Sequence, residues 1–380
     1  MRIKKQSTYN AIAYITIICQ ALTWIGLPLV IYSLVSLSVA MISLVTVGAV
    51  EFLILDRKET VEKNDLILLG GLAALVIFCM MTTATFSFEL VKKIIIVFQL
   101  PVLMLVARRT QGGRARDVIY IANACYPALF LYYYNSPLAH SYMGPYGEIQ
   151  IEAITLGFNN PNETAMYLMA CALLLMAAMF HYKSPFIRFF YGVELLFMLR
   201  LIYETECRSV ILLMAAIMII VFFRRKFSVS KSVIRLAFLL PIGFFLINWG
   251  FPEIGNIVIM GEAADTGRTT IMYSFFEGLT MESFILGDFG RYPLNNMHNA
   301  FLSLLAAFGV LSALAYWGFY YRGFLMICNR KMKSLEGKVL QLGCVAIVLH
   351  GSVEAAFLTS GVIYAASVFL LLFMLAGIEE

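Results

Sequence analysis

The chain has 380 residues, of which 61% are hydrophobic and only 13% are charged, against about 25% charged residues in a soluble domain. With a mean hydropathy of +0.84, this leaves no room for a large soluble domain. The net charge of +5 needs no nucleic-acid partner, because membrane topology accounts for most of it. The sequence therefore predicts an all-α integral membrane protein, residues 1–380, built as a single polytopic domain surrounded by membrane lipid.

Apolar runs of about 20 residues, the length that crosses a bilayer, recur along the chain and predict about twelve transmembrane helices. We expect these spans at about residues 10–32, 36–55, 66–84, 89–107, 117–134, 161–181, 186–204, 208–223, 236–250, 298–321, 338–353 and 358–377. The first two spans should be joined by a tight turn near Leu34–Ser38, and the N-terminus should be an uncleaved first span. The seven Cys residues fit no disulfide framework or zinc spacing, so neither a metal nor a cofactor is expected.

Twenty-two of the 28 Lys and Arg residues fall into six short clusters between the apolar runs. The clusters lie at 2–5, 57–63, 108–116, 183–188, 224–235 and 322–338. Because short basic loops mark the cytoplasmic side, both termini are expected inside. The six exceptions, which fall on the outer side, are Lys92, Lys93, Arg200, Arg208, Arg268 and Arg291. The topology rule gives them no reason to be there, so we expect a bound anion.

Two long outer loops are predicted, at about 135–160 and at 251–297, the latter between the ninth and tenth spans. Inside the larger loop, Ile271, Met272, Phe275, Phe276 and Leu279 recur at helical spacing. This pattern predicts a short interfacial helix, which Thr266 could cap.

Arg208 and Arg268 each stand at the predicted start of a helix, where a cation opposes the helix dipole. An anion shared between the backbone N–H groups and the guanidinium would reverse that penalty, and phosphate suits arginine best. The alternative is an ion pair, with Glu204 or Glu206 for Arg208 and with Asp265 for Arg268. Arg291 follows a turn that contains Asp288, and it is either a third anion ligand or a loop charge beside that carboxylate.

The other outer cations are weaker candidates for anion binding. Arg200 lies four residues before Glu204, so a buried ion pair is an alternative to a functional role. Lys92 and Lys93 begin the fourth span beyond Glu89. Adjacent helical residues face different directions, so at most one of the two lysines can point into a shared site.

His298 is the candidate catalytic residue, because it alone among the four His residues ends the largest outer loop and starts a span. A neutral imidazole can take a proton from a sugar hydroxyl as a general base. The alternative is a histidine that only hydrogen-bonds the loop. In the first outer loop, Asn160 is expected to cap a helix that has Pro161 at its first position and Glu163 at its third.

Three stretches together resemble the O-antigen polymerase (Wzy-type) and O-antigen ligase superfamily of bacterial membrane enzymes. They are 205–209 (Thr-Glu-Cys-Arg-Ser), Gly267-Arg268 with 286–290 (Leu-Gly-Asp-Phe-Gly), and His298-Asn299 followed by Gly309. Segment 157–162 (Gly-Phe-Asn-Asn-Pro-Asn) is also similar to a segment of many Wzy-type polymerases, with Asn159 in place of glycine. In the third stretch Ser312 stands where a second small residue is usual.

The resemblance implies a GT-C-like glycosyltransferase of the bacterial inner membrane, with its active site on the extracytoplasmic face. The arginines and lysines would bind the pyrophosphate of an undecaprenyl-pyrophosphate-linked oligosaccharide, and His298 would deprotonate the acceptor hydroxyl. Asn299, Asn160 and Asn162 would contact glycan, and a chain-length regulator protein is a candidate partner. We expect a metal-independent, inverting polysaccharide repeat-unit polymerase. The alternatives are an O-antigen ligase that transfers the glycan to lipid A core and, in another class, a flippase or transporter of lipid-linked oligosaccharide.

Overall fold

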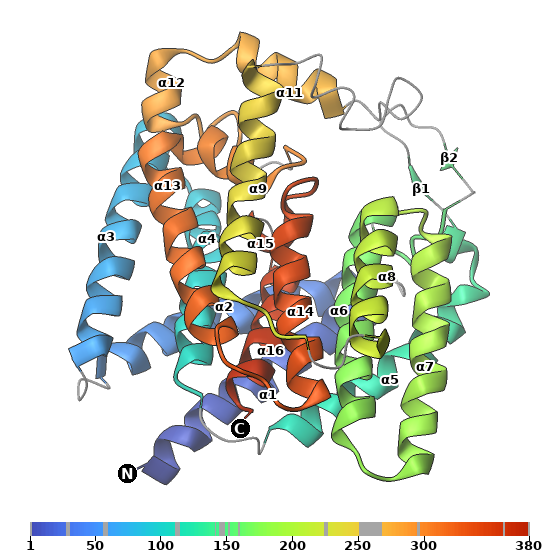
Figure 1. The fold of residues 1–380 in the computed structure, drawn as a ribbon. Coiled ribbons are helices and arrows are strands. Elements are labelled where there is room, and N and C mark those ends of the chain that lie inside the picture. The colour runs from blue at the N-terminus through green and yellow to red at the C-terminus, as the bar shows by residue number, and fades with distance from the viewer. Residues whose placement is uncertain are drawn as a thin grey trace.

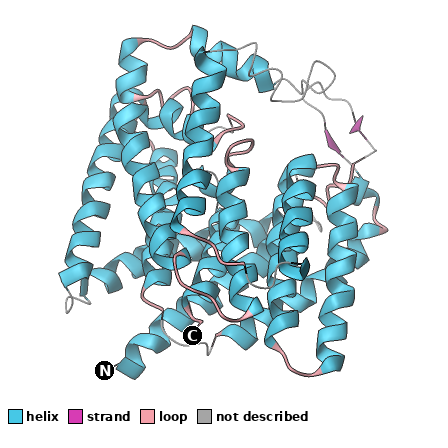
Figure 2. Ribbon diagram, viewed as in Figure 1, coloured by secondary structure: helices cyan, strands magenta, loops and turns pink. Residues whose placement is uncertain are grey.

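The computed structural model describes most of the chain, namely residues 2–27, 31–55, 60–110, 115–140, 142–143, 149–150, 153–158, 160–223, 227–250, 268–294, 297–359 and 362–378. Helices dominate these residues (Figure 2). The helices of the first half are α1 (Arg2–Gly26), α2 (Tyr32–Leu55), α3 (Thr60–Thr83), α4 (Phe88–Arg108), α5 (Arg116–Tyr134), α6 (Pro161–His181), α7 (Pro185–Glu204), α8 (Arg208–Phe223) and α9 (Lys231–Gly250). Those of the second half are α11 (Arg268–Glu277), α12 (Met281–Leu286), α13 (Ala300–Cys328), α14 (Leu335–His350), α15 (Ala356–Thr359) and α16 (Val362–Ala376).

Six of these helices are long and apolar enough to cross a membrane by length and composition, which is compatible with a membrane-embedded all-α protein. They are α1, α2, α3, α4, α6 and α13. The other predicted spans coincide with α5, α7, α8, α9, α14 and α16, so each of the twelve expected segments is helical. Large apolar side chains such as Leu44, Leu212 and Phe223 are exposed on the bundle surface, as expected where lipid is the solvent.

The predicted turn between the first two spans is wrong. Leu34–Ser38 lies within α2, and the chain leaves α1 at Gly26 instead. Ser38 faces α1, where its hydroxyl donates to the carbonyl of Cys19 at 2.7 Å. Uniform hydropathy hid the earlier stop signal, which is Gly26 followed by Pro28.

The tenth predicted span is also not a continuous helix. Gly309 adopts φ 73° and ψ 173° inside α13, so the helix breaks there. Residues 300–308 form a short half-helix that is buried along its whole length. The remainder of α13 continues as a long helix to Cys328.

Both termini lie at one end of the bundle, while α11 and α12 lie at the other (Figure 1). The short loop between α6 and α7, which carries the basic cluster at 183–188, is at the same end as the termini. The first long loop forms a 3-10 turn at Pro137–His140 and two paired strands, β1 (Tyr142–Met143) and β2 (Ile149–Gln150). The expected helix of the large loop exists as α11, and α12 follows it; Thr266 and Asp265 lie outside the described residues.

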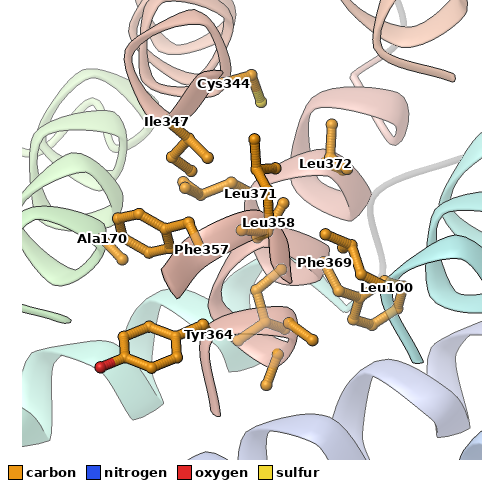
Figure 3. Close-up of a cluster of buried hydrophobic side chains, with 14 of the residues drawn as sticks. Leu100, Ala170, Cys344, Ile347, Phe357, Leu358, Tyr364, Phe369, Leu371 and Leu372 are labelled. Carbon is orange, nitrogen blue, oxygen red and sulfur yellow. The ribbon is translucent and has the colours of Figure 1, made fainter. Parts of the chain in front are cut away.

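The core forms where α14, α15 and α16 meet α4 and α6 (Figure 3). Phe357 and Leu358 of the short α15 fill the centre, with Phe369 and Leu372 of α16 and Ile347 of α14 around them. Six of the seven Cys residues are buried and all are free, as expected for small apolar side chains; Cys125 alone is exposed. This packing fixes the C-terminal end of α14, on which the candidate site is built.

Candidate functional site

The C-terminal end of α14 leads into a tight turn that contacts residues of several helices. After His350 the chain turns through Gly351 and Ser352, and the backbone N–H of Glu354 donates to the His350 carbonyl at 2.9 Å. Glu354 is buried, with a side chain that is 3% exposed. A buried carboxylate is stabilised only when a charged or hydrogen-bonding partner faces it.

His298 is the partner that faces Glu354. Its Nδ1 lies 3.2 Å from Oε2 of Glu354, and its side chain is 19% exposed. A proton on Nδ1 directed at the carboxylate leaves the Nε2 lone pair to accept a second proton. The backbone of His298 is left-handed, with φ 52°, a conformation that costs a non-glycine residue about 1–3 kcal/mol. Contacts with the turn at the end of α14 stabilise His298 in this left-handed conformation.

Asn299 follows His298, and its hydrogen bonds stabilise the left-handed backbone of His298. Its Oδ1 accepts from Leu302 N at 2.9 Å and so caps α13, while Nδ2 donates to the carbonyls of Pro241 and Ser352. The next residue, Ala300, donates its N–H to the Gly351 carbonyl at 2.7 Å. The side-chain amide of Asn299 is fully buried, so the contacts described account for it as a structural cap.

The N-terminus of α8, which carries Arg208, contacts the end of α14 through Ser209. Arg208 is the first residue of α8, as predicted, and its side chain is exposed. The next residue, Ser209, places its Oγ 3.2 Å from Nε2 of His350. Glu206, two residues before Arg208, has a left-handed backbone with φ 57°. Thus the helix start that carries Arg208 and the candidate base His298 contact the same turn at 350–354, although 90 residues separate the two candidates.

The start of α6 is the third element near this turn. Asn160 caps it by accepting from Glu163 N at 3.0 Å, and Pro161 occupies the first helical position, as predicted. Glu163 lies close enough to Glu354 for the two carboxylates to interact electrostatically. Three helix N-termini, those of α6, α8 and α13, are therefore gathered around the C-terminal end of α14. Their dipoles together favour a negatively charged ligand.

The large loop docks on the far end of the half-helix 300–308. Asp288 N donates to the Ala306 carbonyl at 2.8 Å, and Gly287 packs directly on the break at Gly309. A Cβ on Gly287 would lie 2.5 Å from three backbone atoms of residues 307–309. The two glycine-containing stretches singled out in the sequence thus meet in space, and neither position has room for a side chain.

Arg291 and Lys93 border this docking point. The Lys93 ammonium lies over the Phe289 ring at 5.8 Å, and the Arg291 guanidinium lies over Tyr292 at 5.2 Å. Arg291 N also donates to the Asp288 carboxylate at 3.0 Å. This pair lies at the C-terminal end of the half-helix, whereas His298 is at its N-terminal end. Nine helical residues separate the two ends by about 12 Å.

Two other outer cations have local partners. Lys92 is 2.7 Å from Glu89 and lies over Phe88, so it faces away from Lys93, as the helix geometry predicted. Arg200 is 2.9 Å from Glu204 and hydrogen-bonds the Tyr134 hydroxyl at 3.3 Å. The expected ion pair of Arg200 therefore exists, but the arginine side chain is 68% exposed rather than buried.

The remaining predicted residues, Arg268 and Asn162, are placed only by the helices to which they belong. Arg268 opens α11, as predicted, but its side chain lies outside the described residues. Asn162 lies in the first turn of α6, half-buried. Glu354 was missed by the sequence reasoning, although an ionisable residue between two apolar spans is a functional candidate by default.

Within the described residues, no group of three or more His, Cys, Asp or Glu side chains could hold a metal ion. Comparison with models of known families, with curated proteins and with solved structures finds no match to the chain. The functional assignment therefore depends on the chain's own residues.

Proposed function

We propose that the protein is a membrane glycosyltransferase, a polysaccharide repeat-unit polymerase that uses an undecaprenyl-pyrophosphate-linked glycan as donor. The observation that supports this proposal best is the His298–Glu354 pair at a turn where three helix N-termini gather, one of which, that of α8, begins at Arg208. A general base beside an anion-binding surface is what transfer from a diphosphate requires. The twelve-span layout, with both termini cytoplasmic and this site on the extracytoplasmic face, is part of the same proposal.

In the proposed reaction, the hydroxyl oxygen of an acceptor sugar attacks the anomeric carbon of the donor glycan. The bond from that carbon to the pyrophosphate oxygen breaks, and the hydroxyl proton passes to Nε2 of His298. The Glu354 carboxylate stabilises the imidazolium that forms. Attack opposite the leaving group inverts the anomeric configuration.

The pyrophosphate leaves with additional negative charge, which Arg208 and the N-terminus of α8 would stabilise. Arg268 stays a proposed second pyrophosphate ligand on the evidence of its place at the start of α11. Arg291 and Lys93 fit a different part of the substrate, because they lie at the other end of the half-helix. At that end, Arg291 and Lys93 would contact the glycan or the second phosphate of the pyrophosphate.

The test uses purified protein with an undecaprenyl-pyrophosphate repeat unit, followed by separation of the glycan on a gel. A ladder of lengths supports a polymerase. A single shift that requires a separate acceptor indicates a ligase. If folded protein leaves the substrate unchanged, the transferase proposal is contradicted. Transport of the lipid-linked glycan is then the alternative.

A further inference from the structure

A polar site is buried between α5, α6 and α7, at the middle of α6 near Cys171. Glu194 lies halfway along α7 and is 9% exposed. Its Oε2 is fully buried and has no hydrogen-bond partner in the described part of the chain. No Lys, Arg or His among the described residues forms an ion pair with it.

Two further polar atoms, which lie near Cys171 in the middle of α6, are buried without partners among the described residues. They belong to α5, where Asn123 is 2% exposed and Tyr126 is 4% exposed. Neither Asn123 Oδ1 nor the Tyr126 hydroxyl has a hydrogen-bond partner among the described residues. The Asn123 amide nitrogen is already used, because it donates to the Cys171 carbonyl of α6 at 3.1 Å. The Cys171 thiol interacts electrostatically with Glu194 and with Tyr126, so these side chains and Asn123 each lie near the middle of α6.

Buried polar atoms are normally hydrogen-bonded, so the buried Glu194 oxygen without a partner points to a missing ligand. Burying an unpaired carboxylate costs roughly several kcal/mol of folding free energy, unless the group is protonated or binds a cation. As a carboxylic acid, Glu194 can donate its own hydrogen to a neighbouring acceptor. An ordered water would accept that hydrogen and donate to Asn123 Oδ1, which has no partner among the described residues.

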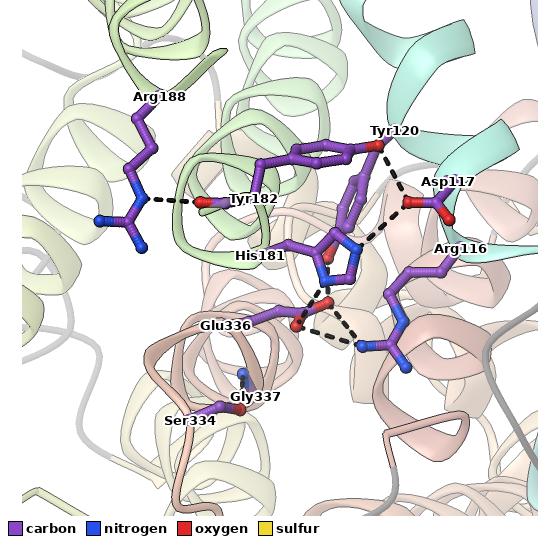
Figure 4. A network of polar contacts seen from close by, with 9 residues as sticks. All are labelled: Arg116, Asp117, Tyr120, His181, Tyr182, Arg188, Ser334, Glu336 and Gly337. Atoms are coloured by element: carbon purple, nitrogen blue, oxygen red, sulfur yellow. Dashed lines mark hydrogen bonds and ion pairs between the residues drawn. The ribbon is translucent and has the colours of Figure 1, made fainter. Parts of the chain in front are cut away.

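A chain of groups connects this site with the end of the bundle that carries the termini. Tyr191, one turn from Glu194 on α7, stacks on Tyr182 with ring centroids 5.6 Å apart. The Tyr182 hydroxyl donates to Asp117 Oδ1 at 3.0 Å, and the Asp117 side chain is 60% exposed (Figure 4). The same carboxylate is 3.2 Å from Nε2 of His181. The Tyr182 and Tyr191 hydroxyls also interact, and Tyr191 interacts electrostatically with Glu194, so these groups form a path from solvent at that end toward Glu194.

We propose that Glu194 is an intramembrane proton-binding site that exchanges its proton with the termini-bearing side through Tyr191, Tyr182 and Asp117. The step moves one proton and no electrons: the Glu194 carboxylic acid becomes a carboxylate, and the proton passes along the hydroxyls to Asp117 or to water. Among the described residues, the titratable groups that interact electrostatically with Glu194 are Cys171 from α6 and Tyr191 from α7, and α5 contributes the uncharged Asn123 beside Cys171. This inference does not rest on the proposed transferase function.

The test labels the full-length protein in native membrane vesicles with dicyclohexylcarbodiimide, which reacts with protonated carboxyl groups in apolar surroundings, and maps the label by peptide mass spectrometry. Label is expected on Glu194 and not on Glu204, the matched carboxylate of the same helix that is paired with Arg200. Label should fall by about tenfold for each pH unit above the titration midpoint. Because the mapping uses the wild-type chain, its result does not depend on whether a Glu194 variant folds.

Two further experiments test whether Glu194 binds a proton or a metal cation, and from which side of the membrane the proton reaches it. Protection of Glu194 by sodium at constant pH would overturn the proposal in favour of a metal-cation site. In vesicles of the two orientations, label should follow the pH on the termini-bearing side, and Tyr191→Phe should slow its response to a pH jump. Absence of label at low pH, or label that follows the pH of the other side, would also overturn the proposal.

Discussion

The substitution Glu354→Gln removes the negative charge beside His298 and leaves a side chain of nearly the same shape. The glutamine amide oxygen can still accept from Nδ1 of His298 at the 3.2 Å distance that the carboxylate now occupies, so the ring keeps its orientation. What is lost is the negative charge that stabilises the imidazolium during turnover. A hydrogen bond to a charged group contributes about 1.5–3 kcal/mol and a neutral one about 0.5–1.5 kcal/mol.

The difference of about 1–2 kcal/mol in the activation free energy predicts a turnover that is roughly 5–30-fold slower. The protein should fold normally, because the substitution also removes the electrostatic repulsion between Glu354 and Glu163. The assay is the initial rate of polymer formation by purified protein at saturating donor, with thermal stability measured in parallel. Glu282→Gln, which changes an exposed carboxylate in the first turn of α12, is the matched control and should have the wild-type rate.

A Glu354→Gln variant with the wild-type rate would refute the reasoning, since it would show that the charge beside His298 does not act in the reaction. A slow variant that is also unfolded would not support it. The rate must fall while the amount and the melting temperature of the folded protein stay unchanged.

Two predictions concern stability and can be checked by heating the detergent-solubilised protein and measuring the remaining monodisperse peak by size exclusion. Gly309→Ala should destabilise the fold by several kcal/mol (about 2–6), because it adds a left-handed alanine and a Cβ that collides with the Ile285 carbonyl. Gly318→Ala in the same helix has open space around its Cβ and should be neutral or stabilising; equal losses in both variants would contradict the break at Gly309. Asn299→Ala should cost about 2–4 kcal/mol without any substrate present, because it removes the cap of α13 and two buried hydrogen bonds. Unchanged stability with weakened glycan binding would instead make Asn299 a substrate ligand.

Local signals in the sequence predicted the helix starts that matter for the site. Arg208 opens α8, Arg268 opens α11, and Asn160 caps α6, because capping residues and hydrophobic periodicity act over a few residues. The same kind of signal could have identified Asn299 as a cap, but its place in a family-like motif led to a prediction of glycan contact.

The errors arise where apolar composition is uniform or where contacts join distant segments. The turn at the end of α1 was placed too late, because the residues on either side of Gly26 are equally apolar. The break at Gly309 depends on Gly287 docking against it, which no local pattern reveals. Glu354 contacts His298 across 56 residues, and only the packing of α14 on α13 brings the two together.

The claim that Arg208 holds the diphosphate is tested most directly by equilibrium binding of undecaprenyl pyrophosphate to the purified wild-type protein and two arginine variants. Arg208→Ala should weaken binding by about 10–200-fold, which corresponds to the roughly 1.5–3 kcal/mol of a charged hydrogen bond. Arg200→Ala, an exposed arginine on the preceding helix that is engaged by Glu204 and Tyr134, should bind like the wild type. Equal affinity of all three proteins would contradict the account.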